Sequence, residues 1–387
     1  MHKRSQWLKI LPDLPVFACS ALGVLLMIHP EWFGIPPHGA VTTDHTNHTP
    51  FYIFPLVFVA IMWCALRAAQ HAEAVAVKLP DPFGSLVLTF SAVFIEVALV
   101  IGVMMTGDAA DTVARDTMFA TLMLIMNGLV GLALIAGALR KREQAFNSQS
   151  SSSYLGVTAA ICTIGLVLPR FTTSEPGGYM TDQMDLFVAG VSLIVYCAFI
   201  FLQSSSHRDF FVVARQEAQI HAQHGDLANQ PLWKLICLLL VALISVVLLS
   251  ESLGDLLVGF LERNSLPPAL QGVVIAFLVL LPEGITAVRS ALSSNVQRTI
   301  NILHGSALST IGLTIPAVLF VAMLFGRNVE LGLEPPEICL LAATLVLSIL
   351  HFGSGKTNMM QGIVHAMLFV VWIAVLMETE PFLSVGP

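Results

Sequence analysis

Two glutamates lie where a carboxylate is hardest to keep ionised. Glu96 and Glu283 are the only acidic residues deep inside long apolar stretches, and each lies near the middle of its stretch. An ionised carboxylate at the centre of a bilayer costs roughly 2.5 kcal/mol or more, and burial and a nearby like charge both favour its protonated form. Each carboxyl group is therefore expected to hold a proton unless a cation takes the proton's place. The pair predicts a site at which cations and protons compete.

A purely structural role is the alternative for each glutamate. A lone carboxyl group in a membrane helix can serve as a hydrogen-bonding partner for a neighbouring helix. Two carboxyl groups at equivalent depths fit that interpretation less well, because both would have to be buried for packing alone.

Further ligands are needed, since calcium takes six to eight oxygen ligands and sodium also prefers oxygen. The run 301–316 is rich in hydroxyl groups, and Asn127 lies within another apolar stretch. Small residues there also permit close helix packing, which is the plainer interpretation. The predicted metal ligands are Glu96, Glu283, Ser306, Asn127, Asn301 and Ser309.

Proton coupling is assigned to Glu96 and Glu283, with His304 as a further proton carrier. His304 could equally form a hydrogen bond across helices. Pro282 lacks a backbone donor and Gly284 loosens a helix, so a broken helix is expected beside Glu283. Broken helices at mid-membrane free backbone carbonyl groups for ions.

The composition requires a membrane to hold these residues. The chain has 387 residues, of which 56% are hydrophobic and 11% charged, and its mean hydropathy is +0.81. Soluble domains carry about 25% charged residues, so a water-soluble enzyme is excluded. A net charge of −7 disfavours nucleic-acid binding. The 6 cysteines are scattered singly, which suggests neither disulfides nor a zinc site.

The apolar stretches predict an all-α polytopic protein with about eleven membrane helices of roughly 20 residues each. The predicted spans are 14–29, 51–69, 83–106, 114–139, 154–169, 184–203, 233–253, 268–292, 299–325, 337–351 and 362–377.

Loop charges predict the orientation of these spans. If the N-terminus is cytoplasmic, 14 of the 18 Lys and Arg residues lie on the inner side of the membrane. The four on the outer side are Arg115, Arg170, Arg263 and Arg327. The C-terminus is then on the outer side. The membrane is predicted to be the plasma (inner) membrane of a prokaryote. Acidic residues such as Asp116 and Glu330 gather on the outer side. They could concentrate cations at an entrance or simply solvate loops.

The chain divides into four parts: an N-terminal helix and outer loop (1–50), a first five-helix repeat (51–203), a cytoplasmic linker (204–232) and a second five-helix repeat (233–387). Five is odd, so equivalent helices cross the membrane in opposite directions, as in an inverted-topology repeat. Glu96 and Glu283 each lie in the second helix of a repeat. They are expected to face each other at the centre of the bilayer.

Two motifs resemble those of a known family. Gly84-Ser85…Ile95-Glu96-Val97 resembles the first signature of the bacterial calcium/proton antiporters in the calcium/cation antiporter superfamily, and Pro282-Glu283-Gly284…Gly305-Ser306…Pro316 resembles the second. The branch that exchanges sodium, potassium or calcium for protons is the most similar. The resemblance implies a sodium/calcium exchanger-like fold and one essential glutamate per repeat, at Glu96 and Glu283. It also implies that the second and seventh helices slide to give alternating access.

One departure concerns the ion. Many calcium/proton exchangers carry Gly-Asn just before the repeat glutamate, but the corresponding positions here are Ala92-Val93 and Leu280-Leu281. Two amide ligands are thus missing, which weakens the case for calcium selectivity.

The sequence therefore predicts a secondary active antiporter that exports calcium in exchange for protons, with sodium or potassium as the alternative cation. A cation channel and an intramembrane enzyme are alternatives of a different class. No enzymatic activity and no cofactor other than the transported cation is expected. The expected partners are the lipid bilayer, inorganic cations and protons, and no nucleic acid. The oligomeric state is not predicted.

Overall fold

Long apolar helices make up almost all of the structure. The computed structural model describes residues 13–33, 52–80, 83–105, 110–175, 177–204 and 230–378. Within these residues, 10 helical spans are long and apolar enough to cross a membrane, and the shorter apolar helix α2 (Leu14–Ile28) makes an eleventh segment. The prediction of an all-α polytopic protein with about eleven helices is confirmed. Much of the linker 204–232 lies outside the described residues.

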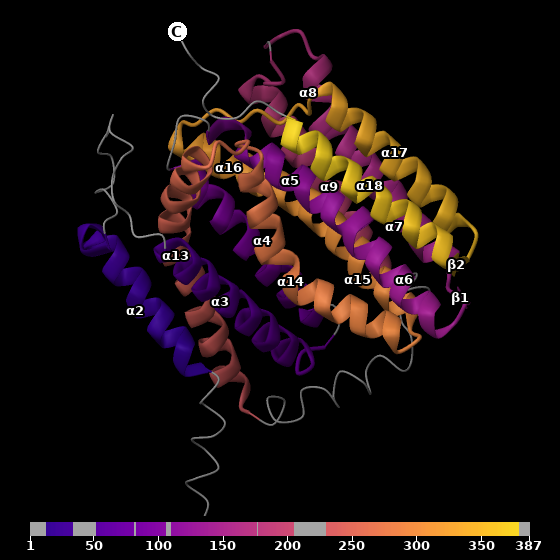
Figure 1. The fold of residues 1–387 in the computed structure, drawn as a ribbon, viewed down its shortest axis with the longest axis horizontal. Coiled ribbons are helices and arrows are strands. Elements are labelled where there is room, and N and C mark those ends of the chain that lie inside the picture. The colour runs from indigo at the N-terminus through magenta and orange to yellow at the C-terminus, as the bar shows by residue number, and fades with distance from the viewer. Residues whose placement is uncertain are drawn as a thin grey trace, which may run out of the picture. The chain divides into compact units, whose positions relative to one another are not determined.

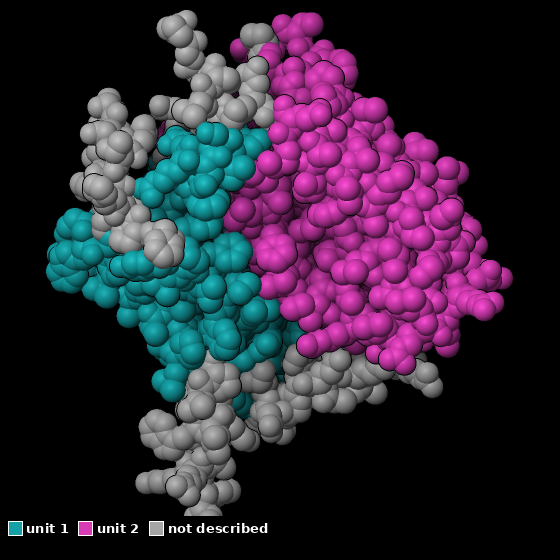
Figure 2. All heavy atoms as spheres, viewed as in Figure 1, with its two compact units in different colours: residues 1–110, 217–268, 381–387 teal, residues 111–216, 269–380 magenta. Residues whose placement is uncertain are grey.

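The helices group into two units, shown in separate colours in Figure 2. The first unit contains residues 1–110, 217–268 and 381–387. Its long central helix α13 (Leu232–Arg263) packs against α2, α3 (Ile53–Ala76) and α4 (Phe83–Met104). Small residues allow close approach: a Cβ at Gly102 of α4 would lie 2.5 Å from Ser250 Oγ of α13. The division into two repeats at 51–203 and 233–387 stays a prediction.

The second unit contains residues 111–216 and 269–380. Helices α17 and α18 run side by side in it (Figure 1), and α18 packs along α6. The ordered elements of this unit are α5 (Val113–Met123), η4 (Leu124–Leu129), α6 (Val130–Arg140), β1 (Glu143–Ala145), α7 (Ser148–Cys162), η5 (Thr163–Val167), α8 (Leu168–Phe171), α9 (Asp182–Ser204), α14 (Leu270–Leu292), α15 (Val296–Ser309), η6 (Thr310–Thr314), α16 (Ile315–Phe325), α17 (Pro335–Gly353), β2 (Lys356–Asn358) and α18 (Met359–Glu378).

The backbone irregularities lie elsewhere than expected. Helix α14 continues through Pro282, so the broken helix predicted beside Glu283 is wrong. A proline inside a helix removes one hydrogen bond without necessarily ending the helix, and packing against neighbouring helices supports α14 on both sides of Pro282. In the described residues, three π-helical turns occur instead, at η4, η5 and η6. Such turns often mark functional sites.

Several helices extend beyond the predicted spans. Helix α13 has 32 residues, or roughly 48 Å at 1.5 Å per residue, against a hydrocarbon core of about 30 Å. It continues ten residues beyond the predicted end at 253 and so includes Asp255, which hydropathy alone assigned to a loop. The sequence marks where the apolar stretch ends, but a helix can continue through polar residues.

Polar contacts fix the helix ends in the second unit. Pro335 begins α17, where Glu334 and Glu337 form a capping box. Asn147 caps α7 and Asn295 caps α15, each accepting a hydrogen bond from a backbone N–H. The short strands β1 and β2 pair antiparallel and join the α6–α7 and α17–α18 connections. The sequence patterns did not predict this ribbon.

Candidate cation site

The second predicted glutamate has a hydroxyl group at its carboxylate. Ser306 of α15 donates a short hydrogen bond from its Oγ to Glu283 Oε2 of α14. The two helices pack against each other, and only three residues connect them. Ser306 is buried, and Glu283 is partly buried. A carboxylate and a hydroxyl oxygen in contact form part of the oxygen-rich environment that hard cations require.

The Leu129 side chain packs closely on the backbone next to Glu283. A Cβ at Gly284 would lie 2.9 Å from Cδ2 of Leu129, the last residue of the π-turn η4. A contact this short would force the Leu129 side chain to shift, so glycine lets that side chain lie directly on α14. Gly284 therefore serves packing here, and not the helix break that the sequence suggested.

The first predicted glutamate lies in the other unit. Glu96 of α4 has only 1% of its surface exposed, and α4 packs against α3 and α13. An acidic side chain this deeply buried agrees with a functional carboxyl group in a membrane helix. Because Glu96 and Glu283 belong to different units, their expected facing arrangement stays a prediction.

The predicted ligand Asn127 is engaged in helix contacts. It lies within η4 and is fully buried. Its Nδ2 donates to Thr344 Oγ1 of α17 at 2.8 Å, and its Oδ1 lies 3.1 Å from Nδ1 of His365 in α18. These bonds use both ends of the amide, so its liganding role stays a prediction that requires them to rearrange.

The other two predicted ligands, Asn301 and Ser309, also lie on α15. Asn301 Oδ1 accepts a hydrogen bond from Gln297 Nε2 at 2.9 Å. Ser309 Oγ donates to the backbone carbonyl of Ser306 at 3.0 Å. Ser309 thus holds the turn of helix that carries Ser306. Direct coordination of a cation by Asn301 or Ser309 stays a prediction.

His304 lies in an apolar environment. Its ring packs edge-on against Phe352 with centroids 4.6 Å apart, and Tyr154 lies 6.5 Å away. Both ring nitrogens are buried, and neither has a hydrogen-bond partner in the described part of the chain. The predicted proton-carrying role therefore has no hydrogen-bonded route among the described residues, and it stays a prediction.

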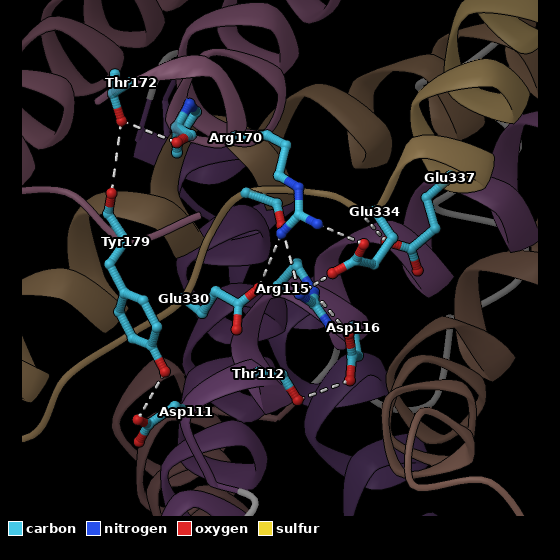
Figure 3. A network of polar contacts seen from close by, with 12 residues as sticks. Asp111, Thr112, Arg115, Asp116, Arg170, Thr172, Tyr179, Glu330, Glu334 and Glu337 are labelled. Atoms are coloured by element: carbon cyan, nitrogen blue, oxygen red, sulfur yellow. Dashed lines mark hydrogen bonds and ion pairs between the residues drawn. The ribbon is translucent and has the colours of Figure 1, made fainter. Parts of the chain in front are cut away.

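A polar network lies at one end of the second unit (Figure 3). At its centre, Arg115 contacts Asp116 at 2.9 Å and Glu330 at 2.5 Å. Arg170 pairs with Glu334 at 2.8 Å. Burial raises the pKa of Glu330 above its usual value, although Arg115 opposes this shift. These acidic groups have protein partners, so they do more than solvate loops.

A buried cluster of charged side chains joins the start of α2 to α3 in the first unit. Asp13, just before α2, accepts hydrogen bonds from Arg67 Nε at 2.9 Å and from His71 Nε2 at 3.0 Å, both on α3. Asp13 and His71 are each 1% exposed. Burial alone would raise the pKa of Asp13, but the hydrogen bonds and positive charge of His71 and Arg67 lower it below 3.8.

Sequence reasoning missed the partners of Asn127 and the Asp13 cluster. His365 and His71 each lie within a stretch otherwise rich in apolar residues, and a histidine in such a place is a signal of a buried polar contact. In the described residues, no group of three or more His, Cys, Asp or Glu side chains is arranged to hold a metal ion.

The family model for "sodium/calcium exchanger protein" matches residues 49–205 and 234–377, which include both glutamates and most of the described helices. The chain belongs to this family. The resemblance to the calcium/cation antiporter superfamily, first based on the two glutamate motifs, is thus confirmed. The chain is a membrane-embedded member of a cation exchanger family.

Named relatives support the same assignment. The chain is 37% identical to y4hA of Sinorhizobium fredii, over 86% of this chain and 91% of the relative. It is 33% identical to the sodium-potassium/proton antiporter ChaA of Escherichia coli, over 82% of this chain and 87% of ChaA. The crystal structure of the H+/Ca2+ exchanger CAX has the same fold, with a TM-score of 0.71 and 15% identity over 95% of this chain and 89% of CAX.

Proposed function

We propose that this protein is a cation/proton antiporter in which Glu96 and Glu283 bind a cation when ionised and protons otherwise. The hydrogen bond from Ser306 to Glu283 is the observation that best supports the proposal, because it brings a second oxygen to the carboxylate. An unpaired carboxylate in a membrane is costly. Release of the cation is therefore coupled to uptake of protons.

Sodium or potassium is the first candidate for the cation. The relative ChaA is named as a sodium-potassium/proton antiporter, and Ala92-Val93 and Leu280-Leu281 provide no side-chain oxygen. Calcium requires six to eight oxygen ligands, so we place it second here. The sequence alone had suggested calcium as the first candidate. The charge of two carboxylates favours calcium, because one divalent ion can replace two protons.

The physiological direction follows from the proton gradient across a prokaryotic plasma membrane. Protons enter, and the cation leaves the cytoplasm. The bias of basic residues supports a cytoplasmic N-terminus and an external C-terminus. Alternating access comes from movement of α3 and α13, which pack against each other within the first unit.

Transport assays in inverted membrane vesicles test the proposal. After a proton gradient is imposed, sodium, potassium or calcium is added separately, and dissipation of the gradient is recorded. Glu96→Gln and Glu283→Gln should each abolish the response. Glu378→Gln, the same chemical change at an exposed helix end, should leave it intact.

Each outcome discriminates between candidates. A response to sodium or potassium supports the first candidate, and a response to calcium alone supports the second. A cation flux without proton movement indicates a channel. A response that survives both glutamine variants contradicts the assignment of the two glutamates.

A further inference from the structure

A chain of polar side chains, buried except for the half-buried His351, passes through the π-turn η4. His351 Nδ1 lies 3.2 Å from His365 Nε2, and His365 Nδ1 lies 3.1 Å from Asn127 Oδ1. Asn127 Nδ2 continues to Thr344 at 2.8 Å. The chain thus joins α17, α18 and the centre of η4.

The direction of these hydrogen bonds follows from the amide. Because Asn127 donates through Nδ2, its Oδ1 is the acceptor, and His365 must donate through Nδ1. The Nε2 of neutral His365 then accepts a hydrogen bond from His351 Nδ1. A π-turn alters the regular backbone pairing of a helix, so a buried donor to the side chain of Asn127, which lies within the turn, helps to fix the turn.

The same π-turn also contacts the helices of the candidate site. η4 packs against both α14 and α15, the helices that carry Glu283 and Ser306. Leu129 of η4 presses against Gly284, the residue after Glu283. The π-turn therefore lies between the histidine chain and the site helices.

We propose that His365, supported by His351, is a positioning residue for transport: it holds η4 in the shape against which the Glu283 segment of α14 packs. His365 is completely buried and contacts the turn through the side chain of Asn127. This inference rests on the proposed antiport function, because its consequence is a change in apparent cation affinity.

Two substitutions separate positioning from proton transfer. Asparagine at position 365 places an amide N–H near the position of the imidazole Nδ1–H, but it cannot take up a proton at neutral pH. Leucine removes the donor and leaves Asn127 Oδ1 unsatisfied. Ser348→Ala is the matched control, since Ser348 is fully buried on α17 and its hydroxyl has no hydrogen-bond partner in the described residues.

Amide hydrogen exchange of the purified full-length protein gives a readout independent of transport. His365→Leu should speed exchange at residues 124–129 by about tenfold, the effect of losing one buried hydrogen bond. His365→Asn and Ser348→Ala should exchange like the wild type. Unchanged exchange in His365→Leu would overturn the inference.

Vesicle transport tests the link to the site. His365→Leu should raise the half-saturating cation concentration by about tenfold while its amount in the membrane stays normal, and His365→Asn should restore the wild-type value. If amide hydrogen exchange speeds up in His365→Leu but the half-saturating cation concentration does not rise, the positioning role is wrong. If His365→Asn restores the rate of amide hydrogen exchange but not transport, the role of His365 is proton transfer and not positioning.

The proposed function can fail separately. If the wild type does not transport cations in exchange for protons, the proposed function is wrong, but the amide hydrogen exchange rates still decide whether His365 holds the turn.

Discussion

At the scale of single residues, Ser306 matters because its hydroxyl meets the Glu283 carboxylate directly. Ser306→Ala removes that donor and one oxygen from the site. We expect the half-saturating cation concentration to rise roughly ten- to hundredfold, the effect of losing one hydrogen bond to a charged group worth about 1.5–3 kcal/mol. Ser306→Thr keeps the hydroxyl group and should stay near the wild type in the same vesicle assay. Equal values for all three proteins would remove Ser306 from the site.

The sequence could identify Ser306 as a site residue, but it could not identify the hydrogen-bond partners of Asn127. Glu283 and Ser306 were predicted because a membrane carboxylate and a nearby run of hydroxyl residues are visible in the chain. Thr344 and His365 lie 217 and 238 residues from Asn127. Their contacts with Asn127 arise only when α17 and α18 pack against η4, which no local pattern indicates.

At the scale of elements, the contact between α14 and η4 depends on the absence of a side chain at Gly284. Gly284→Val should lower the transport rate several-fold, because its added atoms crowd the Leu129 side chain, whose Cδ2 lies 2.9 Å from the position of a Cβ. The double variant Gly284→Val, Leu129→Ala makes room and should recover most of the loss. Vesicle transport rates, normalised to protein amount, provide the measurement. Failure of the double variant to recover would show that glycine is needed for another reason.

The attachment of α2 to α3 should depend on pH. Asp13 has a lowered pKa in the folded protein, so its stabilising contribution is complete above the unfolded value of 3.8 and is lost as the pH falls through the folded value. Asp13→Asn leaves Arg67 buried without its counter-charge and should cost about 3 kcal/mol at pH 7.

Thermal unfolding in detergent at several pH values measures this effect. The difference in Tm between the wild type and Asp13→Asn should be large at pH 7 and should narrow below pH 3.8. Asp182→Asn, at an exposed position on α9, is the control and should change the free energy of unfolding by less than about 0.5 kcal/mol. A difference that does not vary with pH would contradict the electrostatic account.

Hydropathy predicted the helices well and their ends and irregularities poorly. The apolar core of each span is a property of its residues, but the extension of α13 past Leu253 and the π-turn at Leu124–Leu129 are not. The choice between α and π hydrogen bonding in a continuous helix depends on packing partners such as His365. Pro282 illustrates the same limit, since α14 continues through it.

At the scale of the whole molecule, the loop charges predict which ends face the cytoplasm. Asn328 and Gln149 are exposed positions next to predicted outer and inner loops. With the 6 native cysteines replaced, Asn328→Cys should react with an impermeant maleimide on intact cells. Gln149→Cys should react only in inverted vesicles. The opposite pattern would reverse the proposed orientation.

The number of helices and the family could be predicted from sequence, but the grouping of the helices could not. The first unit combines α3 and α4 with α13, although more than a hundred residues separate α4 from α13 along the chain. Close contacts such as Gly102 against Ser250 produce this grouping. A single sequence shows that Gly102 is small but not which helix approaches it.

The length of α13 has a mechanical consequence. A rigid rod of 32 residues, pivoting by only about 5° at one end, moves its other end sideways by roughly 4 Å, given a rise of 1.5 Å per residue. That displacement exceeds the diameter of a water molecule. A tilt too small to disturb the packing near the pivot can therefore open or close a passage at the far end, without any local unfolding of the helix.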